Sequence, residues 1–125
     1  MGTMYSETVL EHFRSPRNYG PLPAADITQE GVNPLCGDRL RIEVKLEAGR
    51  VEMARFRGDA CAIGTAAASL LTEKLRGLSL AEAEELQAAD LVAALDADIK
   101  PARLKCAALP LNALHAGIRA YREGT

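Results

Sequence analysis

A strict alternation of polar and apolar residues between positions 38 and 46 is the most regular pattern in this chain. Alternation of this kind is typical of a β-strand with one buried and one solvated face. A second alternating run over 51–57 follows the turn at Gly49, so the two runs predict an antiparallel hairpin. The inward positions expected are Leu40, Ile42, Val44 and Leu46 in the first run, and Val51, Met53 and, after a slip, Phe56 in the second. Residues 27–32 predict a third, weaker strand.

Apolar residues at helical spacing precede the predicted strands and indicate a helix over residues 5–14. Its apolar positions are Tyr5, Val9, Leu10 and Phe13. Ser6 is placed to cap its start, and Pro16 ends it because a residue before proline avoids helical geometry. Residues 17–25 then form an extended connection to the strands.

Helical patterns also fill the chain after Cys61. Four helices are expected. The first runs from Cys61 to a C-cap at Gly77, and the second begins at the capping box Ser79–Glu82. The third covers Asp90–Leu95, and the last runs from Pro110 to Gly124. We place Pro110 in the first turn of the last helix because proline is favoured there. The order of helix, strands and helices indicates an α+β fold, with a small antiparallel three-stranded sheet and helices packed on one face.

Composition places the chain among ordinary globular proteins. Its 125 residues, 48% hydrophobic and 26% charged, fit one ordered domain over residues 1–125. The net charge of −2 argues against a nucleic-acid partner, which requires a basic surface. No apolar run approaches the roughly 20 residues that span a bilayer, and the start of the chain does not resemble a signal peptide. We therefore expect a cytoplasmic protein without a membrane partner.

The three cysteines, Cys36, Cys61 and Cys106, are the candidate chemistry of the chain. Their odd number and the absence of a C-x-x-C pair make a disulfide framework or a local zinc knuckle a poor explanation. Cysteines of this kind are most often small buried hydrophobic residues. Their local context must therefore decide between simple burial and a site.

That context favours a site. Cys36 lies in a turn-forming segment two residues before Asp38, so in extended geometry the two side chains point the same way. Cys61 opens a predicted helix, whose N-terminus favours a thiolate. Cys106 follows two cationic residues and precedes the last predicted helix. All three thus fall in loops or at helix starts, where a metal site recruits ligands.

Three thiolates and Asp38 would together make a four-coordinate site. Such a set can bind Zn²⁺ tetrahedrally, and thiolates also hold iron–sulfur clusters, usually as four cysteines. A hard carboxylate in place of the fourth thiolate suits a cluster that is passed on better than one that is kept. The site would carry net negative charge, and the candidates to offset it are Arg57, Arg103 and Lys105.

Other residues with possible chemistry are weaker candidates. A cysteine–histidine hydrolase needs a general base, and only His12 and His115 are available. We expect His12 near the end of the first helix, where an imidazolium suits the helix dipole, and His115 as a packing or surface residue. The cluster Arg50, Arg55 and Arg57 is most simply a solvated strand face, which could also meet an acidic partner.

Four segments of the chain, in order, resemble those of one known family. They are Tyr5-Ser6-Glu7 through Pro16-Arg17-Asn18, Asn33 to Asp38 with the first cysteine, Phe56 to Ile63 with the second, and Lys105 to His115 with the third. On these motifs the chain resembles the IscU/SufU (NifU N-terminal-like) iron–sulfur cluster assembly proteins over essentially its full length.

The resemblance implies a three-stranded α+β fold with a metal site at one end, built from Cys36, Asp38, Cys61 and Cys106. Members of the family accept sulfur as a persulfide from a cysteine desulfurase that uses pyridoxal phosphate. IscU-type members assemble [2Fe-2S] or [4Fe-4S] clusters and pass them to apo iron–sulfur proteins. SufU-type members bind zinc and act chiefly in sulfur transfer.

The chain departs from both types. Lys105 stands where IscU-type members have a histidine ligand, and an ammonium has no lone pair for a metal. The spacing between Cys61 and Cys106 leaves no room for the insertion usual in SufU-type members. Of the IscU-type chaperone motif Leu-Pro-Pro-Val-Lys only Pro101 matches strictly, so the sequence gives little support for a dedicated Hsp70 partner.

The leading hypothesis is a sulfur acceptor with Zn²⁺ in its resting state. Cys36 is the expected first persulfide acceptor, Cys106 is the second candidate, and Asp38 is the exchangeable ligand that opens the site. The alternative is a non-catalytic scaffold on which a transient [2Fe-2S] or [4Fe-4S] cluster is built, and a third hypothesis is a structural zinc protein. At this point the sequence leaves open whether the chain is an enzyme.

Overall fold

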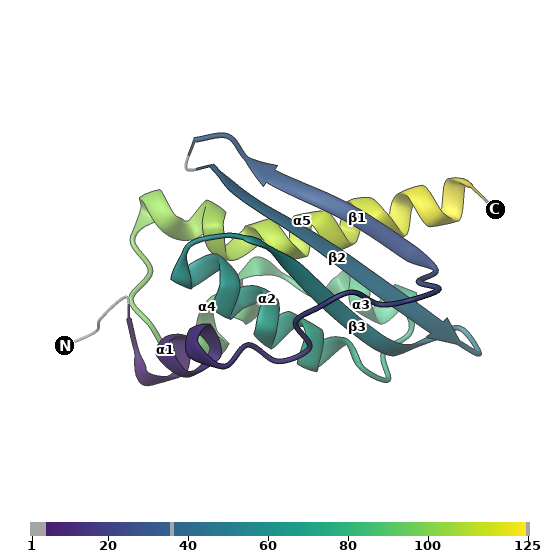
Figure 1. Ribbon diagram of the computed structural model, residues 1–125, viewed down its shortest axis with the longest axis horizontal. Helices are drawn as coiled ribbons and strands as arrows, with labels where there is room; N and C mark the ends of the chain where they lie inside the picture. The colour runs from purple at the N-terminus through teal and green to yellow at the C-terminus, as the bar shows by residue number, and fades with distance from the viewer. Residues whose placement is uncertain (1–4, 36, 125) are drawn as a thin grey trace.

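Three strands in chain order form one antiparallel sheet, and the helices cover one of its faces (Figure 1). The structure is a computed structural model that describes residues 5–35 and 37–124. Its elements are α1 (Glu7–Arg14), β1 (Ile27–Asn33), β2 (Asp38–Glu47), β3 (Arg50–Asp59), α2 (Ala62–Leu75), α3 (Leu80–Glu85), α4 (Ala88–Leu95) and α5 (Pro101–Glu123). The predicted α+β class, the three-stranded sheet and its one-sided cover of helices are confirmed. Across the described residues, no helix is long and apolar enough to cross a membrane.

The alternation predicted for β2 is confirmed. Leu40, Ile42 and Val44 face the core and are at most 1% exposed. In β3 the predicted slip is a β-bulge, because Lys45 pairs with Met53 while Leu46 pairs with Val51, which leaves one extra residue in β3. The buried residues of β3 are therefore Val51, Ala54 and Phe56, and Met53, which we expected to face inward, is only half-buried.

The outer edge of β3 is covered by the connection that follows α1. The N–H of Phe56 donates to the carbonyl of Asn18 at 3.0 Å, and the N–H of Gly20 donates to the carbonyl of Phe56 at 2.9 Å. The ring of Tyr19 between them meets the ring of Phe56 edge to face, with ring centres 5.2 Å apart. This short pairing protects an edge that would otherwise present unpaired backbone groups.

The last helix begins at Pro101, so the expectation that it begins at Pro110 is wrong. Pro101 occupies the first turn that prolines favour, and Pro110 lies inside the helix. The residues between them include Cys106, Ala107 and Leu109, which are all buried. Their burial against the neighbouring helices offsets the cost of a proline within a helix, about 3 kcal/mol.

The first helix is capped by Ser6 as predicted, but its buried face differs. The Ser6 hydroxyl accepts from the Val9 N–H at 3.2 Å and donates to the carbonyl of Leu95 at 2.6 Å. Phe13 is 45% exposed, whereas His12 is buried, with its Nδ1 2.7 Å from the Ser69 hydroxyl. Hydrophobic spacing alone missed this face, because a histidine that finds a polar partner in α2 can be buried.

Burial lowers the pKa of His12 below its ordinary value near 6.5, and the nearby positive charge of Arg17 acts in the same direction. Glu73, whose Oε1 lies 3.8 Å from His12 Nε2, opposes the shift only in part. His12 lies near the end of α1 as expected, but desolvation opposes the favourable effect of the helix dipole on its imidazolium form.

We expect this histidine to make folding stability depend on pH. Because the pKa of His12 is lower in the folded state, neutral His12 makes its full contribution to folding stability above the unfolded pKa near 6.5. This contribution is lost as the pH falls below 6.5, because the unfolded chain then binds the proton more readily. Urea unfolding across this range should give a flatter pH profile for His12→Gln than for the unmutated chain. His115→Gln is the matched control, and an equal flattening by that variant would contradict the assignment to His12.

A second prediction concerns the close approach of β3 to β2 at Gly58. This residue has φ +148°, and a Cβ there would lie 2.2 Å from the carbonyl oxygen of Arg39. We expect Gly58→Ala to lower the free energy of unfolding by on the order of 3 kcal/mol, because backbone must move. Gly49→Ala, also at positive φ but with open space around it, should cost about 1 kcal/mol. Equal losses in urea titrations would show that the clash is unimportant.

Candidate metal centre

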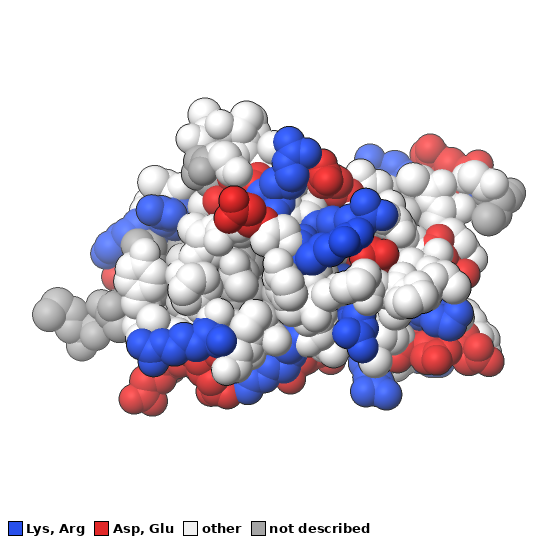
Figure 2. Space-filling view, viewed as in Figure 1, with Lys and Arg blue, Asp and Glu red and all other residues white. Residues whose placement is uncertain are grey.

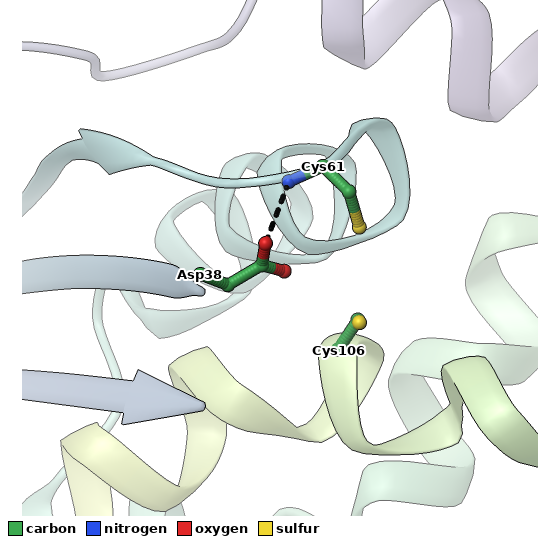
Figure 3. A group of neighbouring side chains, drawn as sticks. All are labelled: Asp38, Cys61 and Cys106. Carbon is green, nitrogen blue, oxygen red and sulfur yellow. Dashed lines mark hydrogen bonds between the residues drawn. The ribbon is translucent and has the colours of Figure 1, made fainter. Parts of the chain in front are cut away.

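Asp38, Cys61 and Cys106 converge at one end of the sheet. Asp38 begins β2, Cys61 precedes α2, and Cys106 lies in the second turn of α5. One ligand atom from each lies within 4.8 Å of the other two. Figure 3 shows the two sulfur atoms pointing toward each other, with the carboxylate beside them. Three of the four predicted ligands are thus brought together from distant parts of the chain.

Asp38 presents an unsatisfied oxygen to this cluster. Its side chain is buried, and Oδ1 accepts a hydrogen bond from the Cys61 N–H at 3.3 Å (Figure 3). Oδ2 has no hydrogen-bond partner among the described residues. A buried carboxylate oxygen without a partner is costly, and a bound cation is one way to satisfy it. The donor set, one carboxylate and two thiols, fits Zn²⁺.

Cys61 is the N-cap of α2, as the sequence predicted. Its sulfur accepts a hydrogen bond from the Gly64 N–H at 3.5 Å. Gly64 lies against both other residues: a Cβ at this position would make ordinary van der Waals contacts, 3.4 Å from Asp38 Oδ2 and 3.5 Å from the carbonyl oxygen of Cys106. The first turn of α2 therefore packs directly against both.

Cys106 lies within a helix, so the expectation that all three cysteines fall in loops or at helix starts is wrong for this one. It is 1% exposed and packs in an apolar cluster with Val9, Ile63 and Leu95. The error follows from placing the start of the last helix at Pro110. Convergence with Asp38 and Cys61, rather than location in a loop, distinguishes this cysteine from an ordinary core residue.

Cys36, the fourth predicted ligand, lies outside the described residues. Its neighbours in the chain are at the same end of the sheet, since Asn33 and Asp38 are paired across β1 and β2. The N–H of Gly37 donates to the carbonyl of Asn33 at 2.8 Å, and Leu35 is 81% exposed.

Of the three cationic candidates, Arg103 is the one that faces the cysteines. Attraction by Cys61 raises the pKa of Arg103 above its usual value, and a hydrogen bond to the Cys61 side chain and the charge of Cys106 act in the same direction. Arg57 instead lies with its Nε 3.7 Å from Glu43 on the outer face of the sheet. Lys105 is exposed on α5. Arg57 is thus engaged by Glu43 on the outer face of the sheet, and the expectation that Lys105 offsets charge at the site stays a prediction.

Neither histidine joins the cluster of possible ligands among the described residues. His12 bonds to Ser69, and His115 Nε2 lies 3.2 Å from the carbonyl oxygen of Ala83 in α3. A cysteine–histidine hydrolase site is therefore not formed by these residues.

Taken together, the structure shows a small α+β protein in which one carboxylate and two cysteines that could hold a metal ion cluster at one end of the sheet. Comparison with known proteins identifies the family: the model of the NifU-like N terminal domain matches residues 4–125. The chain belongs to this family of iron–sulfur cluster assembly proteins, in agreement with the resemblance seen in its sequence.

Curated relatives fall into both types within the family. The chain is 32% identical to the zinc-dependent sulfurtransferase SufU of Bacillus subtilis, over 99% of this chain and 95% of that protein. It is 34% identical to the iron–sulfur cluster assembly scaffold protein IscU of Azotobacter vinelandii, over 95% of this chain and 94% of the relative. Sequence identity alone therefore does not separate the two types.

Solved structures support the fold. A NifU-like protein (N-terminal) from Brucella abortus superposes with a TM-score of 0.78 at 20% identity, covering 98% of this chain and 96% of that one. A putative scaffold protein for the SUF system from Fervidobacterium islandicum gives 0.77 at 23% identity, covering 92% and 96%.

The unpaired oxygen of Asp38 leads to a prediction for the reduced, metal-free protein. We expect Asp38→Asn to raise the free energy of unfolding by about 1 kcal/mol, because the amide keeps an acceptor for the Cys61 N–H and removes a buried charge. Asp59→Asn, at the exposed end of β3, is the control and should change stability by less than about 0.5 kcal/mol.

Added Zn²⁺ should reverse the order of stability in the same urea titrations. The free energy of unfolding should rise more for the unmutated chain than for Asp38→Asn, because a metal stabilises the folded state in proportion to how tightly that state binds it. A loss of stability in metal-free Asp38→Asn would show that this carboxylate is satisfied without a cation.

Proposed function

We propose that this protein accepts persulfide sulfur for iron–sulfur cluster assembly at a centre formed by Cys36, Asp38, Cys61 and Cys106, with Zn²⁺ held in the resting state. The convergence of two cysteine sulfurs with the unpaired, buried oxygen of Asp38 carries this proposal. The name of the Bacillus relative, a zinc-dependent sulfurtransferase, supports the choice of metal. When bound, Zn²⁺ would keep the thiolates deprotonated and hold them in place.

The sulfur donor would be the persulfide of a cysteine desulfurase. A thiolate of this chain attacks the outer sulfur, the sulfur–sulfur bond of the donor breaks, and the desulfurase cysteine leaves as a thiolate. We assign the first attack to Cys36, because it lies in the segment beside the exposed Leu35, whereas Cys106 is buried. Cys106 is the second candidate acceptor.

Two residues would adjust the centre around this transfer. Asp38 would be a hard ligand among soft thiolates. It is therefore the ligand that would leave the metal most readily when an acceptor cysteine takes up sulfur. Arg103 lies beside Cys61 and Cys106, where its positive charge offsets the negative charge of the thiolates. Neither role requires a histidine, which agrees with Lys105 standing exposed on α5 instead of within the cluster.

The second candidate function is a scaffold on which a [2Fe-2S] or [4Fe-4S] cluster is built and passed to apo iron–sulfur proteins. Identity of 34% to the IscU scaffold of Azotobacter vinelandii favours it, as does the chain's lack of the long insertion. The same four residues would serve as ligands. A structural zinc protein is less well supported, because structural zinc sites are typically formed by cysteine and histidine alone, without a carboxylate.

Native mass spectrometry of the anaerobic protein mixed with a cysteine desulfurase, cysteine and ferrous iron tests these functions. We expect Zn²⁺ to be retained and sulfur atoms to be added to the chain. Cys36→Ser should abolish the first addition, whereas Lys105→Ala, the control on the exposed side of α5, should leave it intact. Iron and sulfide bound together with loss of zinc would instead establish the scaffold. Retained zinc without added mass, with a desulfurase active on a control acceptor, would leave only the structural hypothesis.

A further inference from the structure

The open face of the sheet carries a group of arginines that the metal centre does not use. Arg41 of β2 lies directly opposite Arg57 of β3, and Arg39 and Arg55 occupy neighbouring positions on the same face. We call these four residues the arginine face. Lys and Arg side chains gather over the strands in the middle of the view in Figure 2, with acidic side chains beside them.

A buried carboxylate lies at the base of this group. Glu43 is 6% exposed, and its Oε1 lies 3.8 Å from Arg41 Nε and 3.7 Å from Arg57 Nε. Neither Glu43 Oε1 nor Arg41 Nε has a hydrogen-bond partner within the described residues. Glu43 therefore holds two arginines by charge while their side chains, 43% and 45% exposed, remain open to solvent.

This arrangement is unfavourable for the isolated chain. Two like charges directly opposite each other destabilise a pair of strands, and one carboxylate balances only one of the two arginines. A neutral residue at either position would remove the repulsion. The excess positive charge is therefore better explained by an anionic partner than by folding.

A shallow hollow of about 430 Å³ lies among these side chains, and its lining includes Tyr19, Arg39, Arg41 and Arg57. Tyr19 is 49% exposed, yet its hydroxyl donates to the carbonyl of Gly58 at 3.2 Å, so its ring is held in place. Tyrosine and arginine are the residues most often found at the energetic centre of protein interfaces. Arginine also receives carboxylates through paired hydrogen bonds.

We propose that the arginine face binds an acidic segment of a partner protein, with carboxylates received between Arg41 and Arg57. Acidic residues at the rim favour a protein over a phosphate chain. Glu30 pairs with Arg39 at 2.6 Å, and Asp59 lies opposite Arg39. These carboxylates repel a densely charged polyanion but leave room for separate carboxylates on a surface of mixed charge.

The residues of the arginine face are close in sequence to those of the proposed metal centre. Arg39 follows Asp38 in β2, and Arg57 precedes Cys61 by four positions at the end of β3. A protein bound here would be held near Asp38 and Cys61. This inference goes beyond the proposed function and stands on charge and geometry alone, so it does not fail if the centre has another role.

The test is an NMR titration of the full chain with a synthetic acidic peptide of about twelve residues, alternating glutamate and glycine, at low salt where charge is least screened. Signals of Tyr19, Arg41 and Arg57, including the arginine Nε–H groups, should shift. Arg41→Gln combined with Arg57→Gln should weaken binding about tenfold or more. The control pair, Arg76→Gln with Arg119→Gln, removes the same charge from exposed positions elsewhere and should change binding less than about twofold.

Several results would overturn the proposal. One is equal weakening by both pairs, or shifts spread over the whole surface. Another is tripolyphosphate binding the same residues more tightly than the peptide, which would indicate a phosphate site. Shifts at the arginine face on concentrating the protein alone would indicate a second copy as occupant. If the first pair fails to fold by circular dichroism, Arg39→Gln with Arg55→Gln replaces it and should weaken binding in the same direction.

Discussion

The hydrogen bond from the Cys61 N–H to Asp38 Oδ1 joins the first residue of β2 to the start of α2, and the centre depends on that junction. It uses one oxygen of a buried carboxylate, and the other oxygen has no partner in the part of the chain that the structure describes. Because α2 packs on α5, the same junction also fixes where the Cys106 sulfur lies relative to the carboxylate. One hydrogen bond from backbone to side chain therefore connects the sheet to the N-terminus of α2, and the packing of α2 on α5 brings Cys106 to the same place.

Small residues line the start of α2 where it meets the other two residues of the cluster. A Cβ at Gly64 would be in van der Waals contact with Asp38 Oδ2 and with the carbonyl oxygen of Cys106. Ala66 and Ala67 continue the packing of α2 at 0% exposure. The cluster thus lies at the well-packed beginning of this helix.

Local rules predicted the strands, the Ser6 and Ser79 caps and the helix start at Cys61, because each depends on residues adjacent in the chain. They failed where contacts between distant residues decide the outcome. The burial of Cys106, Ala107 and Leu109 stabilises the helical turns before Pro110, so α5 begins at Pro101. Ser69 in α2 provides a buried partner for His12. The sequence pattern of β3 indicated a slip in the alternation, but it did not show at which residue the bulge lies.

The four ligand positions show the same division. Motif resemblance indicated Cys36, Asp38, Cys61 and Cys106 together, whereas spacing alone could not show that Cys106 lies beside Asp38 and Cys61. The sequence offered three cationic residues that could offset charge at the site, and Arg103 was one of them. Only the helical geometry of α5 distinguishes Arg103 from Lys105. A helix begun at Pro101 brings residues three apart onto one face, so Arg103 and Cys106 lie together.

The register of β2 connects the two charged regions of the molecule. Even-numbered residues from Asp38 to Val44 face inward, and odd-numbered residues from Arg39 to Glu43 face outward. A slip of one residue would exchange these faces and remove both the ligand and the arginines. The bulge lies between Lys45 and Leu46, at the far end of the strand, so it adjusts the hairpin without disturbing this register. One pleated strand thus places the buried carboxylate of Asp38 and the exposed guanidinium groups of Arg39 and Arg41 on its opposite sides.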